Sequence, residues 1–374
     1  MDNTISNYSQ TKDNNFNLIR FIAAFLVLFS HSFITTTGDP NTVPLRLLLD
    51  TSWGGIAVDV FFITSGFLIA GSFCNKKGLV PFIWARVLRI YPALIVAMFI
   101  SVFILGMWFT TLKPIEYLSS PETYKYLIKN IILFFGVNQS LPGVFTDNPY
   151  INAVNGSLWT LPFEVKMYFY LTVIGLSIAF IEKKSFLKIS KHAFILIAVM
   201  ALGIYILNYF YSVNSYNFSR LFYMFFVGAA CYQLREKIIL SHKYFLFSLL
   251  VVLISTMQKS VFFLSYIVLL PYIVFYLAYI PKGAIRKFNS LGDYSYGIYI
   301  YSFPIQQSLI ASIPNLTVLS MIIYSFFATL FFSFLSWHLV ESKALKLKNN
   351  IPFITHILSQ YWNILKLSYT AKSK

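Results

Sequence analysis

Ten stretches of mostly apolar residues recur along this chain, and they constrain its fold more than any other feature of the sequence. A helix that crosses the ~30 Å hydrocarbon core of a bilayer needs about 20 such residues. Only 11% of the 374 residues are charged, whereas soluble domains carry about a quarter. The sequence therefore predicts an all-α membrane protein with about ten transmembrane helices. The predicted spans are 16–35, 54–74, 89–112, 157–181, 192–211, 218–234, 244–258, 261–280, 292–312 and 317–340.

The distribution of basic residues predicts the orientation of these helices. With the N-terminus in the cytoplasm, the four inner loops carry fourteen Lys and Arg residues and the outer loops carry six. Cytoplasmic loops of multi-pass proteins have this excess. We therefore expect both termini in the cytoplasm. The net charge of +16 then indicates contact with anionic lipid, so the predicted partner is the membrane lipid bilayer and not nucleic acid.

The apolar pattern also predicts the domain organisation. We expect one transmembrane domain over 14–342, followed by a basic cytoplasmic tail over 343–374. The first apolar segment lacks a small-residue cleavage pattern after it, so we expect it to be retained as a helix. One further apolar segment, 126–137, is too short to span and carries Lys129. Counting it as a span would place the later basic loops outside, so we interpret it as an interfacial or re-entrant part of a long external loop, 113–156.

Three titratable side chains stand inside apolar segments at a similar expected depth. His31 and Asp59 each lie about five residues from the outer end of a predicted helix, and Glu164 lies about seven residues from such an end. Titratable groups in a bilayer are costly and mark functional sites by default. Imidazole is a common general base near neutral pH, and a nearby carboxylate can orient it and stabilise its cation. The pattern predicts a catalytic site that removes a proton from a sugar hydroxyl.

Each of these three residues also has a structural interpretation. His31 can be hydrogen-bonded between two helices, and the two interpretations have about equal weight for an isolated intramembrane histidine. Asp59 can simply bind a neighbouring helix. A direct pair between Glu164 and Lys166 is disfavoured, because residues two apart on a helix point in different directions.

Three arginines lie toward the predicted inner face. Arg20 precedes His31 by eleven residues, which places the two on one helix face roughly 16 Å apart. Arg86 and Arg89 stand inside the apolar run before Pro92. The planar guanidinium binds phosphates in a bidentate manner, although basic residues near an inner face also act as topology anchors. Arginines at one face and a base near the other indicate a long phosphorylated acyl carrier, such as acetyl-CoA, between them.

The two cysteines, Cys74 and Cys231, show neither the spacing of metal ligands nor a pattern that indicates a bridge. The number and spacing of cysteines are the sequence signals for metal sites and for disulfide bridges. We therefore expect no metal site.

Six motifs follow one another along the chain. They are Arg20 followed after ten residues by His31; GGIAVDVFFITSGFLI with Asp59, Ser65 and Gly66; RVLRIYPA with Arg86, Arg89 and Pro92; SLWTLPFEVKMYFY with Trp159, Glu164 and Tyr168; and the late motifs GDYSYGIYIYSFPI and SWHLVESK. In this order and at this spacing they resemble acyltransferase family 3, the integral-membrane acyltransferases that modify bacterial surface polysaccharides. The resemblance runs from about residue 14 to 342.

The resemblance implies an enzyme of the bacterial cytoplasmic (inner) membrane. Such an O-acyltransferase would move an acyl group, usually acetyl, from cytoplasmic acetyl-CoA to a hydroxyl of an extracytoplasmic or lipid-linked polysaccharide: O-antigen, capsule or exopolysaccharide. It also implies roles for the matching residues. They are catalytic His31, Glu164 and Asp59; cofactor-binding Arg20, Arg86 and Arg89; and substrate-binding Trp159, Tyr168 and Ser65.

The chain departs from the family pattern at two places. Ser302 stands where members often have His, so no catalytic role is expected there. Ser342 and Lys343 stand where members often have Arg-Pro, at the inner end of the last helix. The soluble esterase-like extension of some members is not expected, which makes this the stand-alone type. The alternative function is a transporter or flippase of lipid-linked sugars, which would share the helices and buried charges but would not need a coenzyme site.

Overall fold

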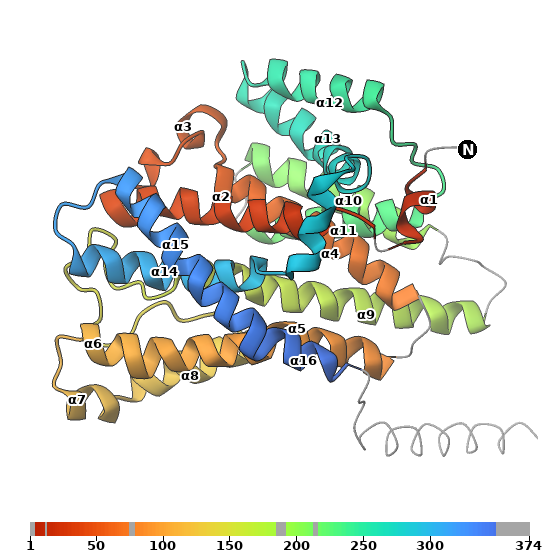
Figure 1. Cartoon of the computed structure of the whole chain (residues 1–374). Coiled ribbons are helices and arrows are strands. Elements are labelled where there is room, and N and C mark those ends of the chain that lie inside the picture. Colours follow the sequence, from red (N-terminus) through yellow and green to blue (C-terminus); the bar gives the residue numbers. More distant parts are fainter. Residues whose placement is uncertain (1–3, 12, 75–78, 185–191, 212–215, 349–374) are drawn as a thin grey trace, which may run out of the picture.

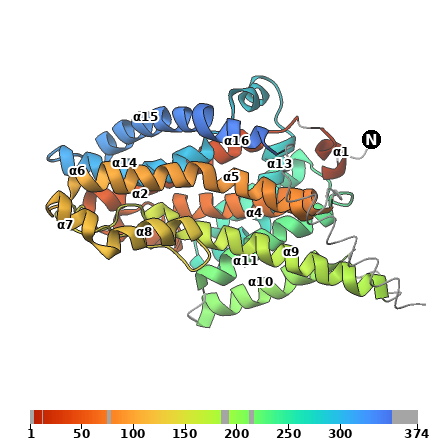
Figure 2. The same cartoon turned by 90° about the horizontal axis from the view of Figure 1, so that it is seen from below.

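The computed structural model describes residues 4–11, 13–74, 79–184, 192–211 and 216–348. Every regular element in these ranges is a helix, so the all-α prediction is confirmed. The long helices run side by side in a bundle (Figures 1 and 2). They are α2 (Phe16–Thr37), α4 (Trp53–Cys74), α5 (Leu79–Phe99), α9 (Leu161–Lys184), α10 (Ala193–Tyr211), α11 (Tyr216–Gln233), α12 (His242–Ser255), α13 (Lys259–Tyr279), α14 (Ser295–Ser312) and α15 (Val318–Ser336).

Seven helical segments in the described part of the chain are long and apolar enough to cross a membrane. They show a multi-pass membrane protein. They are Phe16–Thr37, Trp53–Cys74, Leu79–Phe109, Gly156–Ile178, Ala193–Tyr211, Lys259–Tyr279 and Val318–Lys346.

The other three predicted spans fall on α11, α12 and α14, which are helical but do not meet the same test. Helix α12 has only 14 residues, and α11 and α14 have 18 residues each with lower apolar content. The count of ten spans and the cytoplasmic termini therefore stay predictions. Most of the predicted basic tail, 349–374, lies outside the described residues.

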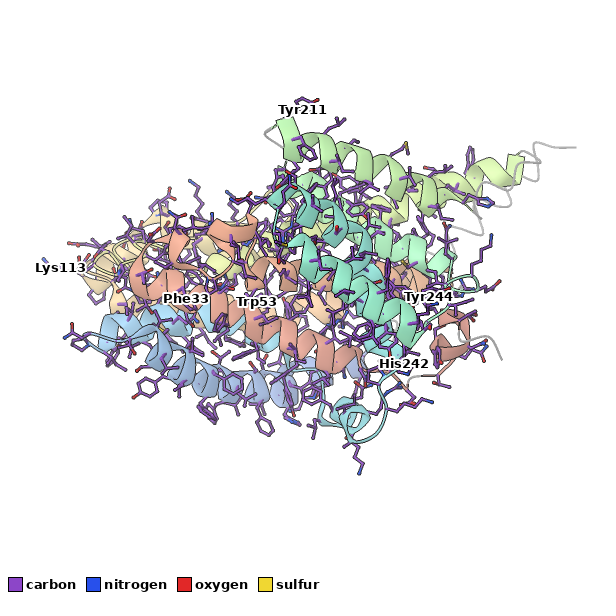
Figure 3. The ribbon with its side chains drawn as sticks, turned by 90° about the horizontal axis from the view of Figure 1, so that it is seen from above. Phe33, Trp53, Lys113, Tyr211, His242 and Tyr244 are labelled. Atoms are coloured by element: carbon purple, nitrogen blue, oxygen red, sulfur yellow. The ribbon has the colours of Figure 1, made fainter. Side chains whose placement is uncertain are left out.

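The loops expected on opposite sides of the membrane lie at opposite ends of the bundle. Lys113, at the start of the long loop 113–156, lies at one end (Figure 3). His242 and Tyr244, next to the basic loop that follows α11, lie toward the other end (Figure 3). This separation agrees with the alternation that the loop charges predict.

The segment 126–137 is largely covered by α8 (Pro121–Ile132), which follows the short helices α6 (Met107–Phe109) and α7 (Pro114–Ser119). Helix α8 packs against α5 and lies alongside it in both views (Figures 1 and 2). The buried side chains of Tyr126 and Asn130 face the bundle, and Asn130 Nδ2 donates to the carbonyl of Asn138 at 2.8 Å. The segment therefore packs along α5, and its interfacial and re-entrant interpretations both stay predictions.

Helix α4 is the most buried of the seven segments and packs against both α2 and α11. Two glycines let α4 and α11 approach closely. A Cβ on Gly66 would lie 1.9 Å from the carbonyl oxygen of Phe225, and a Cβ on Gly228 would lie 2.1 Å from that of Ile63. Small residues permit such contacts between membrane helices. This crossing fixes the position of Asp59 and Ser65, which α4 carries.

Candidate active site

Two neighbouring cavities lie inside the bundle and contain most of the predicted site residues. The first, which we call the His31 cavity, has a volume of about 620 Å³ and is also lined by Asp59 and Trp159. The second, the Arg20 cavity, has a volume of about 390 Å³. Among the described residues, only Val58 and Tyr299 line both cavities. These two side chains therefore form the wall between them.

The Arg20 cavity brings together the predicted cofactor-binding residues and three more predicted site residues. Its lining includes Arg20, Arg86, Arg89, Ser65, Glu164 and Tyr168. Residues from the first, second, third and fourth predicted helices thus meet in one place, as the motif pattern requires. Trp159, which the sequence grouped with Ser65 and Tyr168 as substrate-binding, lines the His31 cavity instead.

Two of the three arginines already have carboxylate partners. Arg89 Nη2 lies 2.6 Å from Asp293 Oδ2, and Arg20 Nη1 lies 3.5 Å from the same oxygen. Arg89 Nη1 also lies 3.8 Å from Glu341 Oε2. Asp293 is held in turn by the Ser295 hydroxyl at 2.5 Å. The sequence motifs GDYSYG and SWHLVESK contain Asp293 and Glu341, but the motifs alone do not show that they neutralise arginines far away in the chain.

Arg86 differs from the other two arginines. Its Nη2 donates to the Ser72 hydroxyl at 3.1 Å, and no carboxylate of the described residues lies within ion-pair distance of it. Its Nε is buried without a hydrogen-bond partner. A buried guanidinium with an unsatisfied donor favours an anionic ligand, because leaving such a donor unpaired is costly. Arg86 therefore fits a phosphate group.

Glu164 lines a different cavity from His31 and Asp59. The phenol of Tyr168 donates to Glu164, and its oxygen also lies 3.3 Å from the Ser65 hydroxyl. Asn155 and Ser157 are fully buried, so this segment is inserted in the bundle before α9 begins at Leu161. The similar depth of the three residues stays a prediction.

His31 contacts this inserted segment. Its Nδ1 lies 3.4 Å from the hydroxyl of Ser157, and its ring packs edge-on against Phe303 with centroids 5.2 Å apart. Neither a hydrogen bond nor an ion pair joins His31 to a carboxylate of the described residues. A serine thus occupies the orienting position where the sequence predicted a carboxylate. A hydrogen bond at Nδ1 leaves Nε2 as the ring nitrogen for a substrate.

Asp59 is fully engaged by two residues that the sequence did not assign to it. Its Oδ1 accepts from Arg220 Nε at 2.8 Å and its Oδ2 accepts from the Tyr266 hydroxyl at 2.7 Å. Arg220 Nη2 also donates to the Gly55 carbonyl at 2.6 Å. The cluster ties α4 to α11 and α13, which matches the structural interpretation of Asp59. In the sequence, Arg220 is one of the six basic residues assigned to the outer loops, because it stands near the start of the sixth predicted span.

Tyr299 connects the cavity wall to the residue that contacts His31. Its hydroxyl donates to the carbonyl of Ser157 at 2.6 Å and is hydrogen-bonded to Thr160. Ser157 is also the residue that contacts His31. Tyr299 belongs to the motif GDYSYGIYIYSFPI, which is the signal that could have singled it out. Ser302 in the same motif lines neither of the two cavities.

Known proteins resemble this chain over most of its length. The profile of the acyltransferase 3 family, described as an acyltransferase domain, matches residues 13–338. An O-acetyl transferase of Shigella phage Sf6 is 28% identical over 342 residues, which cover 89% of this chain and 96% of that protein. Nodulation protein 10 of Rhizobium leguminosarum bv. viciae is 27% identical over 371 residues, 92% of this chain and 96% of that protein. No solved structure gives a significant match.

The family profile spans the first five motifs and the first three residues of the sixth, and residues of these motifs line two adjoining cavities in a multi-pass helical bundle. The chain therefore belongs to the acyltransferase 3 family and is an acyltransferase.

Proposed function

We propose that this protein transfers an acetyl group from cytoplasmic acetyl-CoA to a hydroxyl of a polysaccharide or lipid-linked glycan outside the bacterial inner membrane. The observation that carries the proposal is the pair of cavities that meet at Val58 and Tyr299. One is lined by Arg20, Arg86 and Arg89, and the other is lined by His31. A donor and an acceptor that approach from the two cavities would meet at this wall. The similarity to a protein named O-acetyl transferase supports acetyl as the transferred group.

The residues of the Arg20 cavity would bind the donor. Arg86 would contact its phosphates through its guanidinium group, whose Nε lacks a protein partner. Arg20 and Arg89 would contribute as part of a cluster that Asp293 neutralises. Ser65 and Tyr168, which are hydrogen-bonded to each other, would offer polar contacts to the amide groups of its long arm. The donor supplies a thioester whose carbonyl carbon is the site of attack.

His31 would act as the general base. It takes the proton of the acceptor hydroxyl while the hydroxyl oxygen bonds to the thioester carbonyl carbon and the carbon–sulfur bond breaks. The imidazolium then returns the proton to the released sulfur, so that an ester and a free thiol result. A positioned base contributes about 10²–10⁴-fold to such a step. Ser157 holds the ring through Nδ1, which leaves Nε2 for this transfer.

The two predicted catalytic carboxylates would act through other residues. Asp59 would position Arg220 and Tyr266 on the wall of the His31 cavity. Glu164 would hold the Tyr168 hydroxyl on the wall of the Arg20 cavity. Trp159 would offer an aromatic surface to the sugar acceptor, because it lines the same cavity as His31.

The test is acetyl incorporation by the purified full chain. The protein in lipid nanodiscs is given acetyl-CoA with a labelled acetyl group and a lipid-linked glycan, and label in the glycan is measured. We expect incorporation by the wild type and none by His31→Ala. Movement of the glycan across the membrane of a liposome without any incorporation would overturn the proposal in favour of the transporter or flippase.

A further inference from the structure

A third cavity lies next to the Arg20 cavity. It has a volume of about 960 Å³ and is lined by residues of α1 (Ile5–Ser9), the end of α4, the start of α5 and the end of α11. We call it the Arg235 cavity. It shares Leu68, Ala85, Arg86 and Lys348 with the Arg20 cavity, so the two adjoin at Arg86. It lies at the end of the bundle where α1 is seen in Figure 1.

The Arg235 cavity has basic but no acidic lining residues among those described. Arg86, Arg235 and Lys348 line it. Each of the other two cavities combines both signs of charge, with Glu164 and Asp293 in the Arg20 cavity and with Asp50 and Asp59 in the His31 cavity. A cleft whose charged lining residues are all basic attracts anions. This cavity is therefore suited to a ligand with several negative charges.

Arg235 also provides a flat surface. Its guanidinium lies over the ring of Tyr232 at 4.3 Å, and Nη1 donates to the Tyr232 carbonyl at 2.9 Å, which fixes its position. The contact of Nη2 with Glu236 Oε1 is longer, 3.8 Å, and that glutamate is 75% exposed, so it neutralises Arg235 weakly. Planar guanidinium groups and aromatic rings are the surfaces on which nucleobases stack.

The size of the Arg20 cavity gives an independent reason for a second compartment. Acetyl-CoA is larger than the drug-sized ligands that fill pockets of roughly 300–1,000 Å³. The Arg20 cavity, at about 390 Å³, has room for the pantetheine arm but not for the nucleotide as well. The nucleotide must therefore extend into an adjoining space.

We propose that the Arg235 cavity binds the phosphorylated nucleotide end of the acyl donor. Arg86, at the junction, contacts the phosphates between the nucleotide and the pantetheine arm, and Arg235 contacts the nucleotide. The inference rests on the proposed function, because it takes acetyl-CoA to be the donor. It adds a subsite to which the sequence motifs do not point.

The experiment measures affinity rather than turnover. The full chain in nanodiscs of zwitterionic lipid is titrated with acetyl-CoA and with the acetyl thioester of phosphopantetheine, which lacks the nucleotide. We expect Arg235→Ala to weaken acetyl-CoA binding about tenfold, the size of one lost charge-assisted contact, and to leave binding of the short thioester unchanged. Lys237→Ala is the matched control. It removes a positive charge two residues after Arg235, and the side chain of Lys237 lines none of the three cavities.

Arg235→Lys provides a second variant if Arg235→Ala does not fold, because it keeps the charge and loses the flat surface. We expect it to weaken acetyl-CoA binding less than tenfold. An equal effect of Arg235→Ala on both thioesters, or an effect on neither, would overturn the proposal. Anionic lipid added to the nanodiscs gives a further test. If Arg235→Ala changes only how strongly this lipid inhibits acetyl-CoA binding, the cavity binds lipid headgroups and the proposal is also wrong. Failure of the wild type to bind either thioester would instead reject the donor itself.

Discussion

Asp59 and Arg220 form an ion pair of 2.8 Å across 161 positions of sequence, and both side chains line the cavity that contains His31. The side chain of Asp59 is 1% exposed and that of Arg220 is 12% exposed. A charge in this position is stable only with its partner. The pair therefore links the geometry of the site to the stability of the helices that carry it.

Replacing one residue of this pair should destabilise the protein more than replacing both. Loss of one partner of a buried pair costs about 3–5 kcal/mol, because the other charge is left uncompensated. We expect Asp59→Asn to lower the thermal unfolding temperature, and Asp59→Asn combined with Arg220→Gln to recover part of that loss. Thermal unfolding of both variants in detergent checks this. A double variant less stable than the single one would show that the pair contributes net attraction beyond compensation of charge.

His31→Ala should lower acetyl transfer about 10²–10⁴-fold, as expected for a missing general base, with the affinity for acetyl-CoA unchanged. The unchanged affinity follows because His31 lines a different cavity from Arg20, Arg86 and Arg89. Ser157→Ala should have a smaller effect on transfer, since it removes only the contact at Nδ1. Full activity of His31→Ala would refute its role as the base.

Glu164 and Tyr168 should behave as one unit. The phenol of Tyr168 donates to Glu164, so Glu164→Gln and Tyr168→Phe each disturb the same contact. We expect Glu164→Gln to be nearly inactive and the double variant to be no worse than the poorer single variant, because residues that act together are not additive. Transfer rates of the three variants decide this, and independent, multiplying effects would contradict it.

Arg86 and Arg89 should respond differently to replacement by lysine, which retains the charge but not the planar fork. Arg86→Lys should weaken acetyl-CoA binding, because the nitrogens of Arg86 lack a carboxylate partner. Arg89→Lys should mainly lower stability, because Arg89 holds Asp293 and Glu341. Calorimetric affinity and thermal unfolding, measured on both variants, separate the two roles. The same loss of affinity in both would favour a shared phosphate site.

The close crossing of α4 and α11 should not tolerate a methyl group. Gly66→Ala or Gly228→Ala would place a Cβ within about 2 Å of a facing carbonyl oxygen, and overpacking of this kind costs about 1–3 kcal/mol or more. Gly203→Ala on α10 is the control, because no atom lies within 4 Å of the added carbon. We expect the unfolding temperature to fall in the first two variants and to stay unchanged in the control. Equal stability of all three would mean that the helices can separate without loss.

The positions of the helices could be predicted from the sequence because length and apolar content are local properties. The break between the predicted spans 244–258 and 261–280, for example, falls at 259–260, and the structure has the turn between α12 and α13 close by, at 256–258. Partners of the charged residues could not be predicted in this way. Asp293 reaches Arg89 from 204 positions away, and only the packing of α5 beside α14 brings them together. The contact of Ser157 shows the same limit: the sequence places this residue at the start of the predicted span 157–181, but its neighbour His31 lies 126 positions away.

The wall made by Val58 and Tyr299 also affects the permeability of the membrane to protons and ions. Both side chains line both cavities, and we expect them to interrupt the water between the two. A protein that passes an acetyl group between compartments can in this way keep protons and ions from following it. Shortening both side chains to alanine would join the cavities, and cells that carry such a variant would leak protons and lose part of the gradient across the membrane.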